Sequence, residues 1–285
     1  MTSRRPDGLT MGRAMQVERP WRRAAALSFC LAAVVAPILG GCGSDDDGAP
    51  EDLAPAAAAA GKPEAETVTE ATEASKPAKP ENLRLLDGGN PTVFVKLGET
   101  VDLLDEPGGK VVETVGDTTD FNSRTVFAVQ EQEDDWVAVL TPHTENGEPL
   151  WLRLDAKRLR AGRTIWDIEV DLSEFETRLY EEGKLVRSFP VSIGMPTAPT
   201  PTGRFAVTDT FRGDLNAAYG CCAVATTARQ VNLPSGWLGG DRIAFHGTTG
   251  PLGAKVSHGC IRAADEDVSA LVDMVPPGTP VEVHE

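Results

Sequence analysis

Short apolar runs, broken at regular intervals by turn residues, are the feature that most constrains the fold of this chain. Residues 125–129, 136–140 and 150–154 are three such runs, separated by stretches that contain Gly, Pro, Asp or Asn. Strands of about four to eight residues between turn signals are typical of antiparallel barrels and sandwiches. Because runs of this kind recur as far as Val283, the sequence predicts a mainly β fold.

Residues 91–162 are predicted to form a small all-β module of barrel-like or sandwich type. The arrangement of short runs around Trp136 and Trp151 resembles the bacterial Src-homology-3-like modules that often accompany wall enzymes. That resemblance implies a wall-binding or positioning module. A spacer packed on the following domain is the alternative.

Residues 163–285 are predicted to form a second, β-rich domain. Polar and apolar residues alternate cleanly over 166–172, which indicates a half-buried strand. A hairpin is expected to turn near Gly183, and residues 189–194 are expected to continue the same sheet.

One helix is predicted beside this sheet, beginning at Asp265. Val268, Leu271, Val272 and Val275 follow the spacing of a single apolar helix face. Acidic residues in the first turn suit the positive end of the helix dipole. The apolar stripe is therefore expected to face the core.

The first 42 residues have the layout of a secretion signal. Arginines precede an apolar run that extends to Leu39 and is short for a membrane span. The run ends in Leu-Gly-Gly-Cys at Cys42, which resembles the lipobox of bacterial lipoproteins. The resemblance implies a signal peptide over residues 1–41, lipidation of Cys42 and a membrane-anchored protein of the extracytoplasmic cell envelope. An ordinary secretory peptide and an uncleaved anchor are the alternatives.

Residues 42–90 are predicted to form a disordered linker. From Gly43 to Pro80 the chain is chiefly Ala, Glu, Pro, Thr, Lys, Ser, Gly and Asp and has no aromatic residue. Such a composition buries too little apolar surface to offset the entropy of ordering the chain. The linker would hold the folded part clear of the membrane.

The net charge of the chain is −16. Coulomb repulsion from phosphates therefore opposes binding to nucleic acid, and no nucleic-acid partner is expected.

Side chains suited to covalent catalysis gather near the C-terminal end. His246 ends an apolar run that is expected to be a strand, and His258 and Cys260 are two residues apart, which would place them on one face of an extended backbone. An imidazole accepts a thiol proton and stabilises the thiolate, so we expect the pKa of Cys260 to lie well below the ordinary value of about 8.5. Gly247 and Gly259 are expected to leave backbone amides open to a substrate oxygen. The sequence therefore predicts a cysteine acyl-transfer site.

The order of these residues resembles a known signature. His-Gly, nine residues, then Ser-His-Gly-Cys-Ile-Arg, from His246 to Arg262, resembles the catalytic domain of the bacterial L,D-transpeptidases. Thr-Pro-Thr-Gly-Arg-Phe over residues 200–205 resembles a second element of that family. The resemblance implies a mostly β catalytic domain with a helix beside it. It also implies an enzyme that forms 3–3 cross-links between peptidoglycan stem peptides through a cysteine acyl-enzyme, without a cofactor.

The resemblance also implies a role for each residue. Cys260 would attack the carbonyl between the third stem residue and D-alanine, and a side-chain amine of a neighbouring stem would then accept the acyl group. His246 would be general base and then acid, and His258 would position or stabilise the pair. The amides of Gly259 and Cys260 would form the oxyanion hole. The residues expected to position the loop or the substrate are Ser257, Gly247, Gly259 and Arg262.

Other interpretations remain open. Water could release the acyl group, which would make the protein an L,D-carboxypeptidase, or the chain could be a non-catalytic wall-binding lipoprotein. Cys260 could be a buried structural residue. A zinc site of His246, His258 and Cys260 would lack the paired spacing usual for such ligands, and no metal is expected. Cys221 and Cys222 could form a vicinal disulfide, although alternation between two faces of a strand is the preferred interpretation.

Overall fold

The structure is a computed structural model and describes residues 82–285, apart from Asp214, Leu238 and Gly239. The predicted signal peptide, the predicted lipidation site Cys42 and the predicted linker as far as residue 81 lie outside the described residues. Within the described part of the chain, no helix is long and apolar enough to cross a bilayer.

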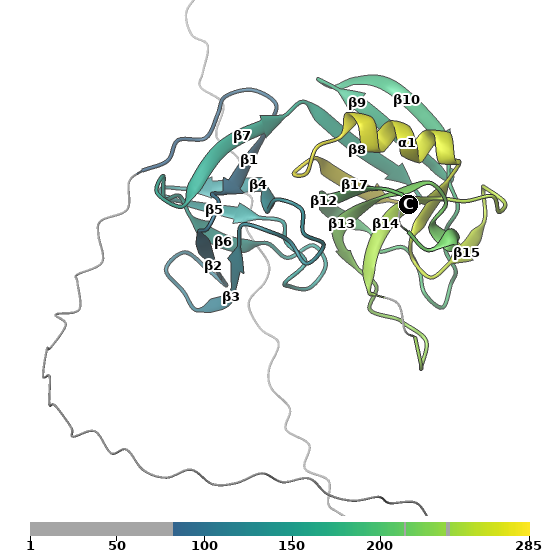
Figure 1. The fold of residues 1–285 in the computed structure, drawn as a ribbon, viewed down its shortest axis with the longest axis horizontal. Coiled ribbons are helices and arrows are strands. Elements are labelled where there is room, and N and C mark those ends of the chain that lie inside the picture. Colours follow the sequence, from purple (N-terminus) through teal and green to yellow (C-terminus); the bar gives the residue numbers. More distant parts are fainter. Residues whose placement is uncertain (1–81, 214, 238–239) are drawn as a thin grey trace, which may run out of the picture. The chain divides into compact units, whose positions relative to one another are not determined.

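Seven antiparallel strands form the first sheet, in the order β3-β2-β6-β5-β4-β1-β7 (Figure 1). Its strands are β1 (Asn90–Val95), β2 (Thr100–Leu104), β3 (Val111–Gly116), β4 (Val126–Glu133), β5 (Trp136–Val139), β6 (Leu150–Arg153) and β7 (Leu159–Thr164). The apolar runs that predicted these strands supply the buried core, with Val93, Leu103 and Leu152 among its members.

Eight strands form the second sheet, in the order β10-β9-β8-β17-β12-β13-β14-β16. They are β8 (Trp166–Asp171), β9 (Glu176–Glu181), β10 (Lys184–Pro190), β12 (Gly203–Arg212), β13 (Cys222–Arg229), β14 (Arg242–Gly247), β16 (Ile261–Ala263) and β17 (Pro280–His284). The pairs β8–β17 and β14–β16 are parallel, whereas the other neighbours are antiparallel. The hairpin of β9 and β10 turns at Glu182 and Gly183, as expected.

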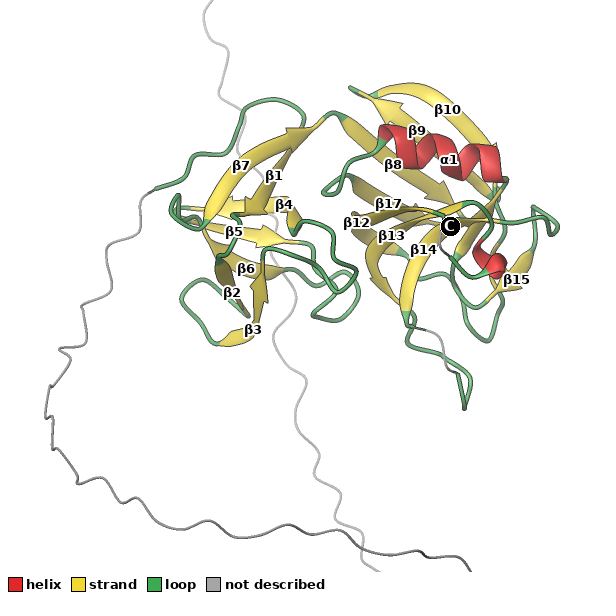
Figure 2. Ribbon diagram, viewed as in Figure 1, coloured by secondary structure: helices red, strands yellow, loops and turns green. Residues whose placement is uncertain are grey.

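Helix α1 (Asp265–Met274) packs on β12, β13 and β14 of the second sheet (Figure 2). Val268, Leu271 and Val275 are buried in the core, which confirms the predicted apolar face. Complete burial of a side chain such as Leu271 contributes about 1.5–3 kcal/mol relative to exposure. The helix begins after Ala264, which offers no side-chain cap, so the carboxylates of its first turn are the groups that stabilise its positive end.

The prediction of a mainly β fold with one flanking helix is confirmed. The expected course of residues 189–194 is wrong, because β10 ends at Pro190. The next strand, β11 (Ile193–Gly194), pairs in parallel with β15 (Lys255–Ser257) outside both large sheets. This pairing brings residues 192–194 beside the segment that carries Cys260.

Candidate active site

Four of the predicted site residues line one cavity of about 320 Å³ in the second sheet. They are His246, His258, Cys260 and Arg262. His246 lies near the end of β14, and Arg262 lies in β16. These two strands pair in parallel. His258 and Cys260 lie in the turn between β15 and β16, so the expectation of an extended backbone at these two residues is wrong.

Cys260 is partly exposed and is the one free cysteine among the described residues. Its sulfur lies 3.9 Å from the carbonyl oxygen of Arg242, at the start of β14. Burial raises the pKa of the Cys260 thiol, and the backbone amide of Ala244 and the guanidinium of Arg262 offset only part of that rise. The expectation of a lowered thiol pKa is therefore wrong for the free protein, because desolvation disfavours the thiolate.

His246 is 3% exposed, and its ring orientation is fixed on two sides. Its Nδ1 lies 2.9 Å from the carbonyl oxygen of Gly247. Because a carbonyl only accepts, Nδ1 carries the proton and Nε2 is left as the acceptor. The ring of Tyr219, in the short helix η1 (Ala217–Tyr219), makes an edge contact with the imidazole at a centroid distance of 4.9 Å. Burial lowers the pKa of His246, and Arg262 lowers it further against the opposing effect of the Gly247 carbonyl.

These shifts keep the thiol and the imidazole neutral near pH 7. Among residues 82–213, 215–237 and 240–285, no hydrogen bond joins the Cys260 sulfur to either His246 or His258. Catalytic hydrogen bonds are often long before substrate binds and tighten in the complex. The arrangement suits proton transfer to His246 during attack rather than a preformed thiolate–imidazolium pair.

His258 lies at the rim of the cavity beside an exposed aromatic residue. The centroids of its ring and that of Trp237 are 4.8 Å apart, and Trp237 is 39% exposed. Gln230 holds the backbone here, because its Nε2 donates to the carbonyl of His258 at 3.1 Å and to that of Pro199 at 2.9 Å. Neither Trp237 nor Gln230 was predicted, since both lie in a loop without a recognisable motif.

Ser257 and Gly259 shape the turn that presents the thiol. The hydroxyl of Ser257 donates to the carbonyl of Cys260 at 2.6 Å and accepts from the amide of Gly259 at 3.1 Å. The predicted oxyanion role of the Gly259 amide is therefore not met in this structure, because that amide already has a partner. The amide of Cys260 donates to no side chain or backbone group of the described residues and is the remaining candidate.

Gly259 is required for the turn itself. Its φ of +109° lies in a region that side chains disfavour, and a Cβ atom there would lie 2.8 Å from Cδ1 of Ile243. Thr200 supports the same residue, because its Oγ1 donates to the Gly259 carbonyl at 2.8 Å and accepts from the Gly194 amide at 2.9 Å. The sequence motif over residues 200–205 indicated that this region belongs to the catalytic domain, but it did not predict the contact of Thr200 with Gly259.

Gly247 is required for close packing around its Cα. A Cβ at this position would collide with the carboxylate of Asp265 and would lie 3.1 Å from the amide of Cys221. The expectation that the Gly247 amide is open to a substrate oxygen stays a prediction. The carbonyl of Gly247 has its own role as the acceptor for His246.

Arg262 is held by its backbone and leaves part of its side chain unpaired. Its amide and carbonyl both bond to Ser192 at 2.8 Å. Its Nε is buried and has no hydrogen-bond partner within the described part of the chain. Because its charge lowers the pKa of both His246 and Cys260, Arg262 is the cation that acts on both groups.

Cys221 and Cys222 are joined by a disulfide, so the preferred interpretation of two thiols on opposite strand faces is wrong. Cys222 begins β13 and is buried, whereas Cys221 is half-buried just before it. The next residue, Ala223, pairs with His246 across the sheet. Within the described residues, no group of three or more His, Cys, Asp or Glu side chains is placed to hold a metal ion.

A thiol and a neutral imidazole that line one cavity, with the free ring nitrogen as an acceptor, fit a cysteine-dependent acyl-transfer type of site. Residues 166–283 match the model of the YkuD family, described as the L,D-transpeptidase catalytic domain. The family model and the relatives described next support the resemblance of this domain to the L,D-transpeptidase catalytic domain.

The YkuD protein of Bacillus licheniformis is 33% identical over 125 residues, which are 41% of this chain and 64% of that protein. L,D-transpeptidase 1 of Mycobacterium tuberculosis is 31% identical over 115 residues, or 35% of this chain and 43% of the relative. The chain therefore spans less than two thirds of either relative. A crystal structure of a mutant L,D-transpeptidase from Enterococcus faecium has 29% identity and a TM-score of 0.31, over 42% of this chain and 49% of that one.

Proposed function

We propose that the second domain is a peptidoglycan L,D-transpeptidase that forms 3–3 cross-links through an acyl-enzyme on Cys260. The observation that carries the proposal is that a neutral thiol and a neutral imidazole line the same cavity. His246 is buried, carries its proton on Nδ1 because of Gly247, and keeps Nε2 as an acceptor. Neutral imidazole is the form that accepts a proton, so burial prepares this residue as a base near pH 7.

In the first half-reaction, the Cys260 sulfur attacks the carbonyl carbon between the third stem residue and D-alanine, and the thiol proton passes to Nε2 of His246. The carbonyl becomes an oxyanion, which the Cys260 amide is placed to receive. The intermediate collapses when the carbon–nitrogen bond breaks, and His246 returns the proton to the leaving amine of D-alanine. The products are a thioester on Cys260 and free D-alanine.

In the second half-reaction, a side-chain amine of a neighbouring stem attacks the thioester carbonyl and gives a proton to His246. The carbon–sulfur bond then breaks, and the sulfur takes the proton back. Arg262, whose buried Nε has no partner among the described residues, would orient the loop or hold a substrate carboxylate. Ser257 fixes the turn through its bonds to Gly259 and Cys260, and His258 would position or stabilise the reacting pair.

The test is incubation of the purified protein with tetrapeptide muropeptides, followed by mass spectrometry. We expect dimers joined between the third residues of two stems, with release of one D-alanine for each link. Tripeptide alone, with D-alanine released even when acceptor amine is abundant, would identify a carboxypeptidase. No change in any muropeptide would favour a non-catalytic wall-binding protein.

We further propose that the protein is a lipoprotein tethered at Cys42 on the outer side of a membrane, with a linker that starts at residue 42. The predicted end of that linker at residue 90 is too late, because Leu83 and Leu85 pack against the core of the first sheet. The Leu-Gly-Gly-Cys sequence that ends the signal-like segment supports this proposal. Wild-type protein should carry radiolabelled lipid and Cys42→Ala protein should not. Equal labelling of both would contradict it.

The first sheet is proposed to be a Src-homology-3-like module over residues 91–162. Seven short antiparallel strands around a single apolar core support this assignment. A wall-binding role predicts that the purified protein sediments with isolated peptidoglycan even when Cys260 is replaced by Ala. Loss of sedimentation with that replacement would place all wall binding in the second domain.

A further inference from the structure

The strand that lies against the Cys260 sulfur is held at its first residue, Arg242. The carbonyl oxygen of Arg242 lies 3.9 Å from that sulfur. Its side chain makes separate contacts with two neighbouring strands: Nε donates to the carbonyl of Thr226 at 3.0 Å, and Nη2 donates to Oγ1 of Thr208 at 2.8 Å. The backbone of one residue thus faces the thiol while its side chain ties β14 to β12 and β13.

The first sheet adds a contact to the same side chain. Phe121, in the loop between β3 and β4, places its ring centroid 5.6 Å from the guanidinium carbon of Arg242. The same ring makes an edge contact with Phe211 of β12, with centroids 5.4 Å apart. Burial lowers the pKa of Arg242, which indicates that the cation is partly desolvated. An aromatic face attracts such a cation more strongly than it attracts a hydrated one.

A second loop of the first sheet contacts β13, the strand that pairs with β14, at the residue opposite Arg242. Asn146, between β5 and β6, donates from Nδ2 to the carbonyl of Arg229 at 2.6 Å and accepts from the Arg229 amide at 2.8 Å. Arg229 is paired with Arg242 across the β13–β14 ladder. Both loops therefore contact the end of the sheet at which β14 begins.

A third contact between a loop of the first sheet and the second sheet involves the buried carboxylate of Asp209. Oγ1 of Thr119 donates to Oδ1 of Asp209 at 2.5 Å. Asp209 is fully buried in β12, and its other carboxylate oxygen has no partner within the described residues. Removal of Thr119 would leave this buried carboxylate without the one side-chain hydrogen bond that it has among the described residues, a costly outcome that favours the docked arrangement.

We propose that the first sheet fixes the position of β14, and through it the Cys260 thiol, with Arg242 as the positioning residue. Two backbone groups of β14 lie against the sulfur, the Arg242 carbonyl and the Ala244 amide. Both belong to the part of the strand that the loops of the first sheet support. The inference rests on the proposed function for the role of Cys260, although its test does not require that function.

The test measures the alkylation of Cys260 by iodoacetamide as a function of pH in the full-length protein. Trypsin cuts after Lys255 and Arg262, so Cys260 is the only cysteine of the peptide over residues 256–262, and mass spectrometry of that peptide reports on it alone. The variants are Phe121→Ala, which removes the ring, and Phe121→Tyr, which keeps it. Trp136→Ala is the matched control, because Trp136 faces Arg153 at 5.8 Å within the first sheet.

We expect Phe121→Ala to raise the alkylation rate at pH 7 by about threefold to tenfold, the range that loss of a partly desolvated cation–π contact allows. The pH midpoint should fall, since a loosened β14 admits water to the sulfur and favours the thiolate. Phe121→Tyr and Trp136→Ala should match the wild type. None of the variants changes the charged or titratable side chains that line the cavity of the thiol, namely Tyr219, Asp241, Arg242, His246, His258 and Arg262.

Asn146→Ala is the second variant and decides the result if Phe121→Ala does not fold. It removes both contacts to Arg229 without altering an aromatic residue, and it should shift the midpoint in the same direction. Wild-type midpoints in both folded variants would overturn the inference, as would an equal shift in Trp136→Ala. Failure of every protein to cross-link muropeptides would contradict the proposed function and leave the alkylation result standing.

Discussion

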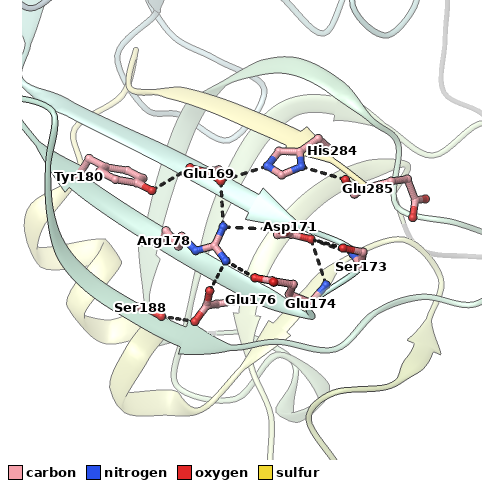
Figure 3. Close-up of polar contacts among 10 residues, drawn as sticks. All are labelled: Glu169, Asp171, Ser173, Glu174, Glu176, Arg178, Tyr180, Ser188, His284 and Glu285. Carbon is pink, nitrogen blue, oxygen red and sulfur yellow. Dashed lines mark hydrogen bonds and ion pairs between the residues drawn. The ribbon is translucent and has the colours of Figure 1, made fainter.

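Ionisable side chains gather in two regions of the second sheet, the cavity of Cys260 and a cluster around Arg178 on β9. We call the second region the Arg178 cluster; it consists of Glu169, Asp171, Glu174, Glu176 and Arg178 (Figure 3). In the cluster, one guanidinium pairs with four carboxylates, among them Glu169 at 3.0 Å and Glu176 at 2.6 Å. In the cavity, neither the thiol nor the imidazole has a charged partner within hydrogen-bonding distance in the described residues.

The pKa shifts in the two regions favour opposite charge states. In the cluster, a hydrogen bond from Tyr180 lowers the pKa of Glu169, and hydrogen bonds from Ser173 lower the pKa of Asp171. The charged forms are thus stabilised. In the cavity, burial favours the neutral forms of Cys260 and His246. Ionisable groups that are paired, as in the Arg178 cluster, stabilise the folded state. Groups that lack a charged partner, as in the cavity, stay neutral and are able to donate or accept a proton.

The largest expected effect comes from Cys260→Ala. Acyl transfer should fall to background, since the nucleophile is gone, while the melting temperature stays near that of the wild type, because hydrogen bonds of a thiol to the Arg242 carbonyl and the Ala244 amide are weak. Muropeptide analysis and thermal unfolding measure the two quantities. Residual cross-linking would show that Cys260 is not the nucleophile and would remove the contrast between the two regions.

His246→Gln should lower the single-turnover acylation rate by about 10²–10⁴-fold, the usual contribution of a general base. Adding Cys260→Ala should cost little more, because residues that act as a unit are not additive. His258→Gln is the matched control and should cost less, mainly through misplacement of the thiol. If His258→Gln abolishes acylation and His246→Gln retains most of it, the roles of the two histidines are reversed.

Gly259→Ala tests whether the cavity of Cys260 depends on backbone geometry, because it strains the turn and changes no charged side chain. The φ of +109° and the crowding by Ile243 predict a loss of about 1–3 kcal/mol in the free energy of unfolding. The acylation rate should fall by about tenfold or more, because small misplacements of a reacting group are costly. Gly183→Ala, at a hairpin where a Cβ meets no neighbour, is the control and should leave acylation unchanged. Wild-type acylation in Gly259→Ala would mean that the turn tolerates the strain.

The smallest effect is expected from Arg178→Gln, which should lower the melting temperature at pH 7 and leave acylation unchanged. The pKa values of Glu169 and Asp171 are depressed in the folded state, that of Glu169 first by the hydrogen bond from Tyr180 and also by Arg178. Their stabilisation is therefore present above the unfolded pKa, near 4, and is lost as the pH falls through the folded pKa. The difference in melting temperature from the wild type should shrink at acidic pH.

The control is Arg212→Gln, which removes one exposed ion pair with Asp273 and should change little, because exposed pairs contribute little. A fall in acylation in Arg178→Gln would show that the cluster and the cavity are coupled.

The sequence by itself determined the class of fold and predicted which side chains react. Alternation over residues 166–172 and the stripe of Val268, Leu271 and Val275 report burial directly, because side-chain periodicity follows from backbone geometry. The order from His246 to Arg262 was likewise sufficient to indicate a cysteine acyl-transfer site. Because these signals are local, they can be recognised from neighbouring residues in the sequence.

Tertiary structure alone decided the electrostatics and the supports of the site. The rise in the pKa of Cys260 comes from burial, the tautomer of His246 from a turn of the backbone at Gly247, and the occupied amide of Gly259 from Ser257. The ring of Phe121 meets Arg242 across more than a hundred residues of chain. Desolvation and long-range contacts depend on which atoms surround a group in space, and no local pattern in the sequence carries that information.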